Sequence, residues 1–351
     1  MKMTNMVRSA TMLSVSVALS GAALFPLKAV ASDALAKPEH SQSETVAQGS
    51  SQITVSELSF IAQDTNQPEA QRVEALQALS NAASQNALVA VARGLKDDSA
   101  KVREAAILGA KPYPLKHRWR LVAPLLTDTD KLVRLTAATN LVRDYATLTD
   151  SQKSQLMPVV EELKQHLTNQ PQAAYQLLLA DVERWTEEWQ KADKRYHQLL
   201  SNDQSNPQIW LSLADNYRAQ GKDNQAIVVL DQAIELAPSE AALHYAKSLA
   251  YVRLENKVAA AKEIQLAVDL AENNSYYWYL NGVLQEEFDI DKSTRSFEQA
   301  YMISGDPVQL YAVCDMYVRY DNDNSDACLE ELAKSAPANV IDELKLKKGK
   351  I

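Results

Sequence analysis

The chain has 351 residues, and its 36 basic and 45 acidic side chains give a formal net charge of −9. Only 8 residues are glycine and 12 are proline, whereas 46% are hydrophobic. Few turn residues and a large apolar fraction predict a folded, nearly all-helical protein. Glycine-rich phosphate-binding motifs are absent from the sequence, and an acidic chain is a poor non-specific ligand of nucleic acid. Nucleotide-dependent catalysis and nucleic-acid binding are therefore not expected.

Residues 1–31 have the organisation of a secretory signal peptide. Lys2 and Arg8 precede a short, interrupted apolar stretch from Met12 to Leu27, and Ala29-Val30-Ala31 forms a small-x-small cleavage site. A transmembrane anchor is the alternative, but a spanning helix needs a longer apolar run. Cleavage removes three of the 36 basic residues and no acidic one, which leaves 33 against 45 and a net charge of −12. We therefore expect a periplasmic protein without a membrane span. After cleavage, the mature chain is expected to begin with a flexible linker over residues 32–52.

Residues 53–148 contain a short sequence repeat with an interval of 31 residues. The segment Leu95-Lys96-Asp97, Val102-Arg103 and Ala106 recurs as Leu126-Thr127-Asp128, Val133-Arg134 and Ala137. Each unit is expected to form a helix, a turn whose aspartate caps the next helix, and a second helix. Such a pair can bury its apolar face only by stacking on its neighbours. The pattern resembles short HEAT repeats, of which about three fit into this region.

A second repeat occupies residues 172–337, and a connecting helix is expected over residues 149–171. Its clearest unit, residues 207–239, carries Trp210, Leu213, Ala214, Tyr217, Gly221, Ala226, Leu230, Ala233 and Pro238. This spacing resembles the 34-residue tetratricopeptide (TPR) signature. Small alanines let two antiparallel helices approach, and the larger side chains fill the space between them. The expected fold class is an all-α solenoid of HEAT-like helix pairs followed by TPR helix pairs. Residues 338–351 are expected to be a frayed C-terminal tail that contains Lys345 and Lys347.

The TPR resemblance implies a binding surface on the inward positions of each first helix. On this sequence the candidate residues are Asp215, Arg218, Tyr245, Leu249, Arg253, Tyr276, Tyr279 and Glu286. Tyrosines flanked by arginines are typical of binding hot spots, so a peptide or helix of a protein partner is the expected ligand. The alternative is that some of these tyrosines pack against the next repeat.

Two further groups of residues draw attention. Cys314 and Cys328 lie on opposite sides of the polar turn 321–325, and two antiparallel helices there could bring them within bridging distance. Disulfides persist outside the cytoplasm, so a bridge is expected, with two small buried side chains as the alternative. The second group is a basic cluster with two aromatic neighbours, which either binds an acidic partner or forms a solvated turn. Its members are Lys111, Tyr113, Lys116, His117, Arg118, Trp119 and Arg120.

The sequence contains no pattern typical of catalysis. The five histidines lack metal-ligand spacing, and neither a covalent haem motif nor a G-x-S-x-G nucleophile occurs, so we expect no cofactor, no metal and no enzymatic activity. The order of leader, HEAT-like and TPR units is similar to the haem-free C-terminal half of exported multihaem c-type cytochromes, over residues 69–300. That resemblance implies a scaffold for a c-type cytochrome or another respiratory envelope complex. An accessory factor in cytochrome maturation or envelope protein assembly is one alternative, and a tetrapyrrole lyase is an alternative of another class.

Overall fold

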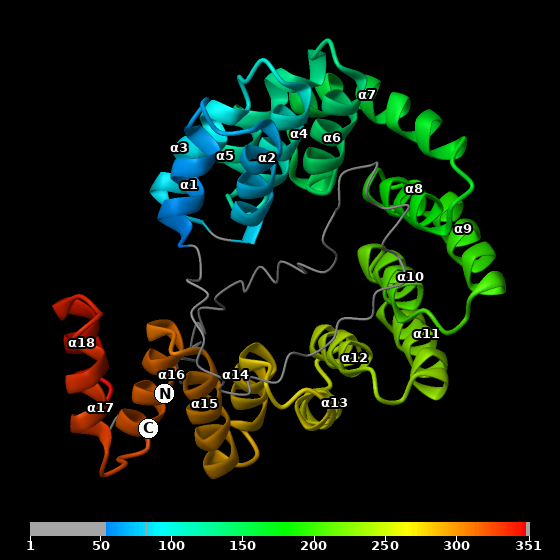
Figure 1. Cartoon of the computed structure of the whole chain (residues 1–351). Coiled ribbons are helices and arrows are strands. Elements are labelled where there is room, and N and C mark those ends of the chain that lie inside the picture. The colour runs from blue at the N-terminus through cyan, green and yellow to red at the C-terminus, as the bar shows by residue number, and fades with distance from the viewer. Residues whose placement is uncertain (1–53, 82, 349–351) are drawn as a thin grey trace, which may run out of the picture. The chain divides into compact units, whose positions relative to one another are not determined.

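A computed structural model describes residues 54–81 and 83–348, so the predicted signal peptide and linker lie outside the described residues. The described part forms eighteen α-helices and three short 3-10 helices, without a strand (Figure 1). This arrangement confirms the expected all-α repeat fold. Contacts divide the chain into an N-terminal unit, Met1–Ala137, and a C-terminal unit, Ala138–Ile351. The division falls within helix α6 rather than at residue 148, where the sequence repeat ends.

The N-terminal unit consists of stacked helix pairs. Helix α1 packs on α2 and α3, and α4 packs on α2 and α3, so each pair contacts the next. The side chains of Ser84 and Ser99 begin α3 and α4 by accepting hydrogen bonds from backbone N–H groups. The elements are α1 (Val55–Gln63), α2 (Glu69–Ala78), η1 (Leu79–Asn81), α3 (Gln85–Gly94), α4 (Ala100–Gly109), α5 (Leu115–Val122), η2 (Ala123–Thr127) and α6 (Lys131–Val142), of which α6 crosses the division.

The repeated aspartate and arginine link consecutive pairs of the N-terminal unit. Arg103 donates from Nε and Nη2 to the carboxylate of Asp128, each over 2.8 Å. One repeat earlier, Arg72 pairs with Asp97 through a single bond from Nη1. Asp97 also accepts from the backbone N–H of Ser99 over 2.9 Å, which shapes the turn. The prediction that the acid of the turn caps the following helix holds in one of the two repeats. Asp130 accepts from the backbone N–H groups of Leu132 and Val133 at the start of α6. In the other repeat Ser99 caps α4, and Asp97 holds the arginine of the preceding pair.

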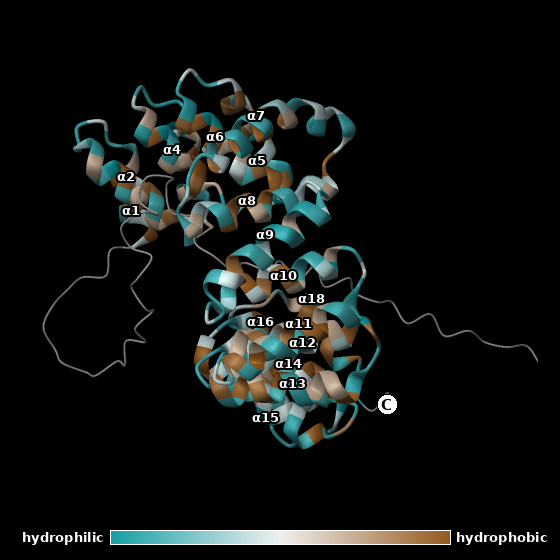
Figure 2. Ribbon diagram, turned by 90° about the vertical axis from the view of Figure 1, so that its right-hand side faces the viewer, coloured by the Kyte–Doolittle hydropathy of each residue, from teal (hydrophilic) through white to brown (hydrophobic). Residues whose placement is uncertain are grey.

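The C-terminal unit contains the short 3-10 helix η3 and the long helix α7. Five helix pairs and a last helix follow them. The predicted connecting helix is α7, which Thr149 and Gln152 begin by exchanging side-chain-to-backbone hydrogen bonds. The elements are η3 (Tyr145–Thr147), α7 (Asp150–Thr168), α8 (Ala173–Trp185), α9 (Trp189–Asn202), α10 (Pro207–Ala219), α11 (Asp223–Leu236), α12 (Ala241–Arg253), α13 (Lys257–Leu270), α14 (Ser275–Gln285), α15 (Ile290–Ser304), α16 (Pro307–Arg319), α17 (Ser325–Leu332) and α18 (Ala338–Lys345). Hydrophobic and hydrophilic residues alternate along these helices, as expected where each packs on its neighbours (Figure 2).

The residues of the 34-residue signature do in the structure what their sizes predict. Trp210 is buried, and its indole N–H donates to the carbonyl of Gln204 over 2.8 Å. Trp278 makes the equivalent bond to the carbonyl of Glu272 over 2.7 Å. Gly282 lies so close to the ring of Phe297 that a Cβ atom would come within 2.9 Å of it. The small positions therefore set the distance between the two helices of a pair.

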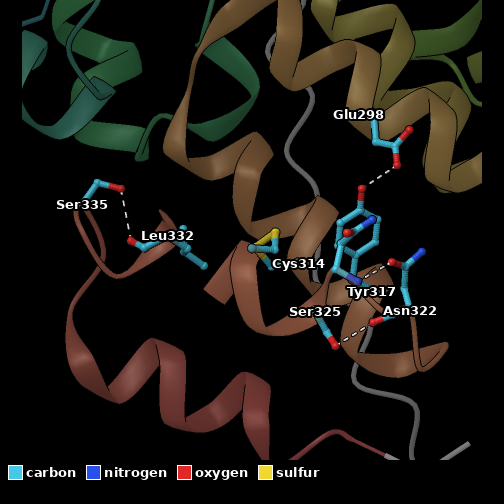
Figure 3. The surroundings of a disulfide bond; sticks show 9 residues. Glu298, Cys314, Tyr317, Asn322, Ser325, Leu332 and Ser335 are labelled. Carbon is cyan, nitrogen blue, oxygen red and sulfur yellow. Dashed lines mark hydrogen bonds between the residues drawn. A yellow bond between two sulfur atoms is a disulfide. The ribbon is translucent and has the colours of Figure 1, made fainter. Parts of the chain in front are cut away.

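The C-terminal end is folded further than the sequence indicated. Cys314 and Cys328 form a disulfide, with their Cα atoms 5.5 Å apart (Figure 3). Nearby, Tyr317 donates to the Glu298 carboxylate over 2.6 Å. The prediction of a frayed tail was wrong for residues 338–345, which form α18. Ile341 and Leu344 are buried against the disulfide-bonded pair, because their spacing places both on one face of the helix.

A buried polar network replaces one of the large aromatic residues of the signature. His244 stands at the position of Trp210 and Trp278, and its Nδ1 lies 2.7 Å from Oε2 of Glu263. The other carboxylate oxygen of Glu263 lies 2.6 Å from Nζ of Lys247, which also contacts Asp231 over 2.8 Å. Burial alone would raise the pKa of Glu263, but the hydrogen bonds from His244 and Lys247 outweigh it and lower the pKa.

The Glu263 network predicts a pH-dependent stability. Because the folded-state pKa of Glu263 lies below its usual value of 4.5, the carboxylate stabilises the fold above about pH 4.5, and this contribution is lost as the pH falls through the lower, folded value. We expect Glu263→Gln to reduce the free energy of unfolding by about 3 kcal/mol at neutral pH. Urea unfolding of both proteins, followed by circular dichroism, should show this difference shrinking in acid. An equal difference at pH 7 and pH 3 would contradict the assignment.

Turns between the paired helices predict a second stability effect. Glu255 occupies the left-handed region at φ 59°, and Gly221 occupies the equivalent position of the preceding pair at φ 70°. A side chain costs about 1 kcal/mol in this conformation. We therefore expect Glu255→Gly to raise the free energy of unfolding by about that amount and Gly221→Ala to lower it. No atom lies within 4 Å of a Cβ built at Gly221, so the loss would come from the backbone alone. A less stable Glu255→Gly variant in thermal unfolding would contradict this account.

Candidate binding surface

The eight candidate residues of the TPR resemblance lie on or directly after the first helices of three consecutive pairs. Asp215 and Arg218 belong to α10, Tyr245 and Leu249 to α12, and Tyr276 to α14. Helix α10 contacts both α8 and α12, so first helices neighbour one another along the C-terminal unit (Figure 1). We call the surface formed by these inward positions of α8, α10, α12, α14 and α16 the first-helix face.

The charged candidates are paired within the chain. Arg218 donates from Nε to Asp215 over 2.8 Å. Arg253 donates to Asp223, at the start of α11, over 2.6 Å. Glu286 accepts from Arg319 and, over 3.0 Å, from the hydroxyl of Tyr320. The first pair lies within α10, whereas the other two join neighbouring helices.

Sequence reasoning missed the continuation of these pairs at both ends of the unit. Arg184 donates to Tyr196 over 3.2 Å and to Asp181 over 3.1 Å, and Asp215 lies 3.9 Å from it. Burial and the nearby carboxylate of Asp181 raise the pKa of Tyr196 well above its usual value. A signal existed, because Asp181 and Arg184 precede Asp215 and Arg218 by 34 residues.

At the other end, Arg319 donates to Asp315 over 2.7 Å. Asp315 also accepts from Lys347, which lies just after α18, over 2.6 Å. Lys347 therefore docks the last helix on α16 rather than belonging to a loose end. No repeat pattern could have indicated this contact, because residue 347 lies beyond the last repeat.

The candidate tyrosines divide into buried and exposed ones. Tyr245 is buried, with its ring stacked on Tyr277 at 5.0 Å and edge-on to Tyr276 at 6.0 Å. Tyr279 is partly buried, and its ring meets Phe297 edge-on at 5.4 Å. Burial is the main reason that the pKa values of both hydroxyls are raised. Tyr245 and Tyr279 thus pack between helices, as the alternative interpretation held, whereas Tyr276 is exposed.

Exposed apolar side chains remain on the first-helix face between the two groups of ion pairs. They are Val252 of α12 and Tyr276 and Val283 of α14, with Leu249 partly buried beside Tyr245. Val283 stands one 34-residue repeat after Leu249, and Val252 one repeat before Glu286, so both hold inward positions. The groups around Arg184 and Arg319 precede and follow these helices in the stack. The face therefore offers a partner an apolar patch on a rigid base, with the neighbouring charges of Arg253 and Glu286 paired within the chain.

The N-terminal unit offers less. Of the predicted basic cluster, Tyr113 is buried and donates to the carbonyl of Ser84 over 3.1 Å, while its own carbonyl accepts from Arg118 over 2.9 Å. Lys116 and Arg120 are exposed on α5. These contacts give the cluster a structural part, with only some of its cations directed to solvent.

A cleft of about 490 Å³ lies elsewhere in the N-terminal unit, lined by residues that include Gln63, Arg72, Arg93 and Lys96. No three side chains of the described residues are placed to hold a metal ion. Within the same ranges, no helix has both the length and the apolar character needed to cross a membrane.

Comparison with known proteins identifies part of the C-terminal unit. Residues 214–254, which extend from α10 to the end of α12, match the family described as TPR repeat. No curated protein matches the chain.

Several solved structures are similar in fold. YrrB, titled a TPR protein with an unusual peptide-binding site, has 18% identity and a TM-score of 0.41, with 53% of this chain and 99% of that one covered. MamA from Desulfovibrio magneticus RS-1 has 15% identity and a TM-score of 0.39, covering 50% and 97%. PilF of Pseudomonas aeruginosa has 16% identity and a TM-score of 0.41, covering 61% and 97%. By its family match and its helix pairs, the C-terminal unit of this chain contains tetratricopeptide repeats.

Proposed function

We propose that the protein is an exported, non-enzymatic adaptor whose first-helix face binds a segment of another protein. One observation carries the proposal: Val252, Tyr276 and Val283 are exposed at inward positions of consecutive first helices. Large apolar side chains at such positions gain free energy when a partner covers them. Tyr276 adds an aromatic ring with a hydrogen-bonding end, which is typical of residues that dominate interfaces.

The rigidity of the surface supports the same proposal. Tyr276 rests on the buried ring of Tyr245, and ion pairs join α12 to α11 and the end of α14 to α16. A surface that is already ordered loses little conformational entropy on binding. The occupant that fits is a peptide or helix with apolar side chains at its centre.

The compartment and the partner belong to the proposal as well. The signal-like residues 1–31 and the disulfide between Cys314 and Cys328 support a periplasmic location, because disulfides persist in oxidising compartments. The sequence resemblance to the haem-free half of multihaem cytochromes supports a c-type cytochrome or another respiratory envelope complex as the partner.

Photo-crosslinking tests which surface is used. A benzophenone amino acid at Val283 should yield a discrete adduct in the native host, because this position would lie under the partner. The same group at Val228, which is also exposed but lies on the second helix α11, is the matched control. Mass spectrometry identifies the adduct. Adducts at Val228 with none at Val283 would contradict binding on the first-helix face.

Two tyrosine variants separate binding from folding. Tyr276→Ala should weaken the binding of the partner identified by crosslinking by about 2 kcal/mol, since an exposed anchor residue is lost. Tyr245→Ala should instead lower the free energy of unfolding by about 3 kcal/mol, because it leaves a cavity under the face. Calorimetric titration and urea unfolding measure the two effects. A Tyr276→Ala variant with unchanged affinity would remove this residue from the proposed site.

A further inference from the structure

Two consecutive turns between first and second helices expose large apolar side chains that are not part of the first-helix face. Leu254 and Val258 flank the turn between α12 and α13, and Phe288 and Ile290 flank the turn between α14 and α15. These four side chains, here called the turn patch, are between 39% and 69% exposed. Lys257 pairs with Glu287, so the two turns lie side by side.

The apolar character of the turn patch is not needed to form the turns. The preceding turn, between α10 and α11, has Gln220 where the next pair has Leu254, and Asn224 where it has Val258. Both turns place the equivalent residue in the left-handed region, Gly221 in one and Glu255 in the other. Since the same turn is made with polar residues in this chain, the exposed apolar side chains call for another explanation.

Acidic residues surround the turn patch. Residues 252–258 and 284–291 contain five acidic side chains and two basic ones. Arg253 is paired with Asp223 and Lys257 with Glu287, so neither cation offsets Glu255 or Asp291. The surrounding unit adds to this field, because residues 138–348 contain 33 acidic and 20 basic residues, a difference of −13.

We propose that the turn patch is a docking site for a basic amphipathic helix of a protein partner. The apolar face of such a helix covers the four side chains, and its lysines or arginines face Glu255, Asp291 and the neighbouring carboxylates. The negative charge around the turn patch favours a basic helix over the other possible occupants. A second copy of this unit would bring like charges together, and an anionic membrane surface would repel it. Its four residues are not part of the first-helix face, and the proposal does not depend on the function proposed for that face.

A model peptide provides the test. The probe is an acetylated, fluorescein-labelled 14-residue peptide of leucine and lysine in amphipathic helical spacing, titrated against the signal-cleaved protein by fluorescence anisotropy. The same peptide with glutamate in place of lysine is the charge control. We expect saturable binding of the lysine peptide, weakened by salt, and at least tenfold weaker binding of the glutamate peptide.

Paired variants locate the site. Leu254→Ser with Phe288→Ser should weaken binding at least tenfold. The matched control is Leu236→Ser with Leu270→Ser, which removes two leucines that are 53% and 41% exposed at the ends of α11 and α13, and it should leave affinity unchanged. Glu255→Lys with Asp291→Lys should weaken binding without removing apolar surface. Circular dichroism and thermal unfolding verify that each variant is folded.

Three results would overturn the proposal. If the Leu254→Ser, Phe288→Ser variant bound the peptide as tightly as the control variant Leu236→Ser, Leu270→Ser, the peptide would bind the acidic surface without the turn patch. A dimer in sedimentation velocity that the Leu254→Ser, Phe288→Ser variant abolishes would assign the patch to a second copy. Flotation with phosphatidylglycerol vesicles that the same variant abolishes would assign it to a membrane.

Discussion

The close contact of a small residue with a large one inside a helix pair is the constraint from which the packing of the C-terminal unit follows. Gly282 against Phe297 shows it most directly, because a single added carbon would come within 2.9 Å of the ring. This approach fixes the distance between the two helices, and the buried side chains around it then fill the remaining space. Because these contacts hold the two helices of a pair together, the positions that do not lie between the two helices can carry other residues. The exposed tyrosine and valines of the first-helix face depend on this freedom.

The interior of the fold could be predicted from sequence, because its residues repeat. Trp210 and Trp278 stand in equivalent positions and make equivalent hydrogen bonds, and the capping residues Thr149 and Gln152 are close in sequence. Contacts that do not repeat could not be predicted. Lys347 reaches Asp315 from beyond the last repeat, and nothing in the spacing indicates that two such distant residues meet.

The candidate surface was predictable only in its location. The TPR resemblance selected Tyr245 and Tyr276 equally, since both hold inward positions. The structure separates them, because Tyr245 stacks on Tyr277 of the next pair while Tyr276 remains exposed. The position of a residue within a repeat determines the direction in which its side chain leaves the helix. Whether that side chain is exposed to solvent depends on the size of its neighbours. Neighbouring residues also explain why Arg218 is not free for a partner. It forms an ion pair with Asp215, which lies one helical turn away on the same helix.

The disulfide has a consequence for how the molecule opens. In a linear stack each pair is stabilised by its neighbours, so the last pair, with a neighbour on one side only, is the natural starting point for unravelling. Here Cys314 and Cys328 join the two helices of that pair, and α18 covers them. Opening that begins at this end must therefore detach α18 first and then stops at a covalent clamp. Where proteases are present, such a terminus would behave as a fixed boundary, and α14 and α16 would keep their register during fluctuations of the rest of the chain.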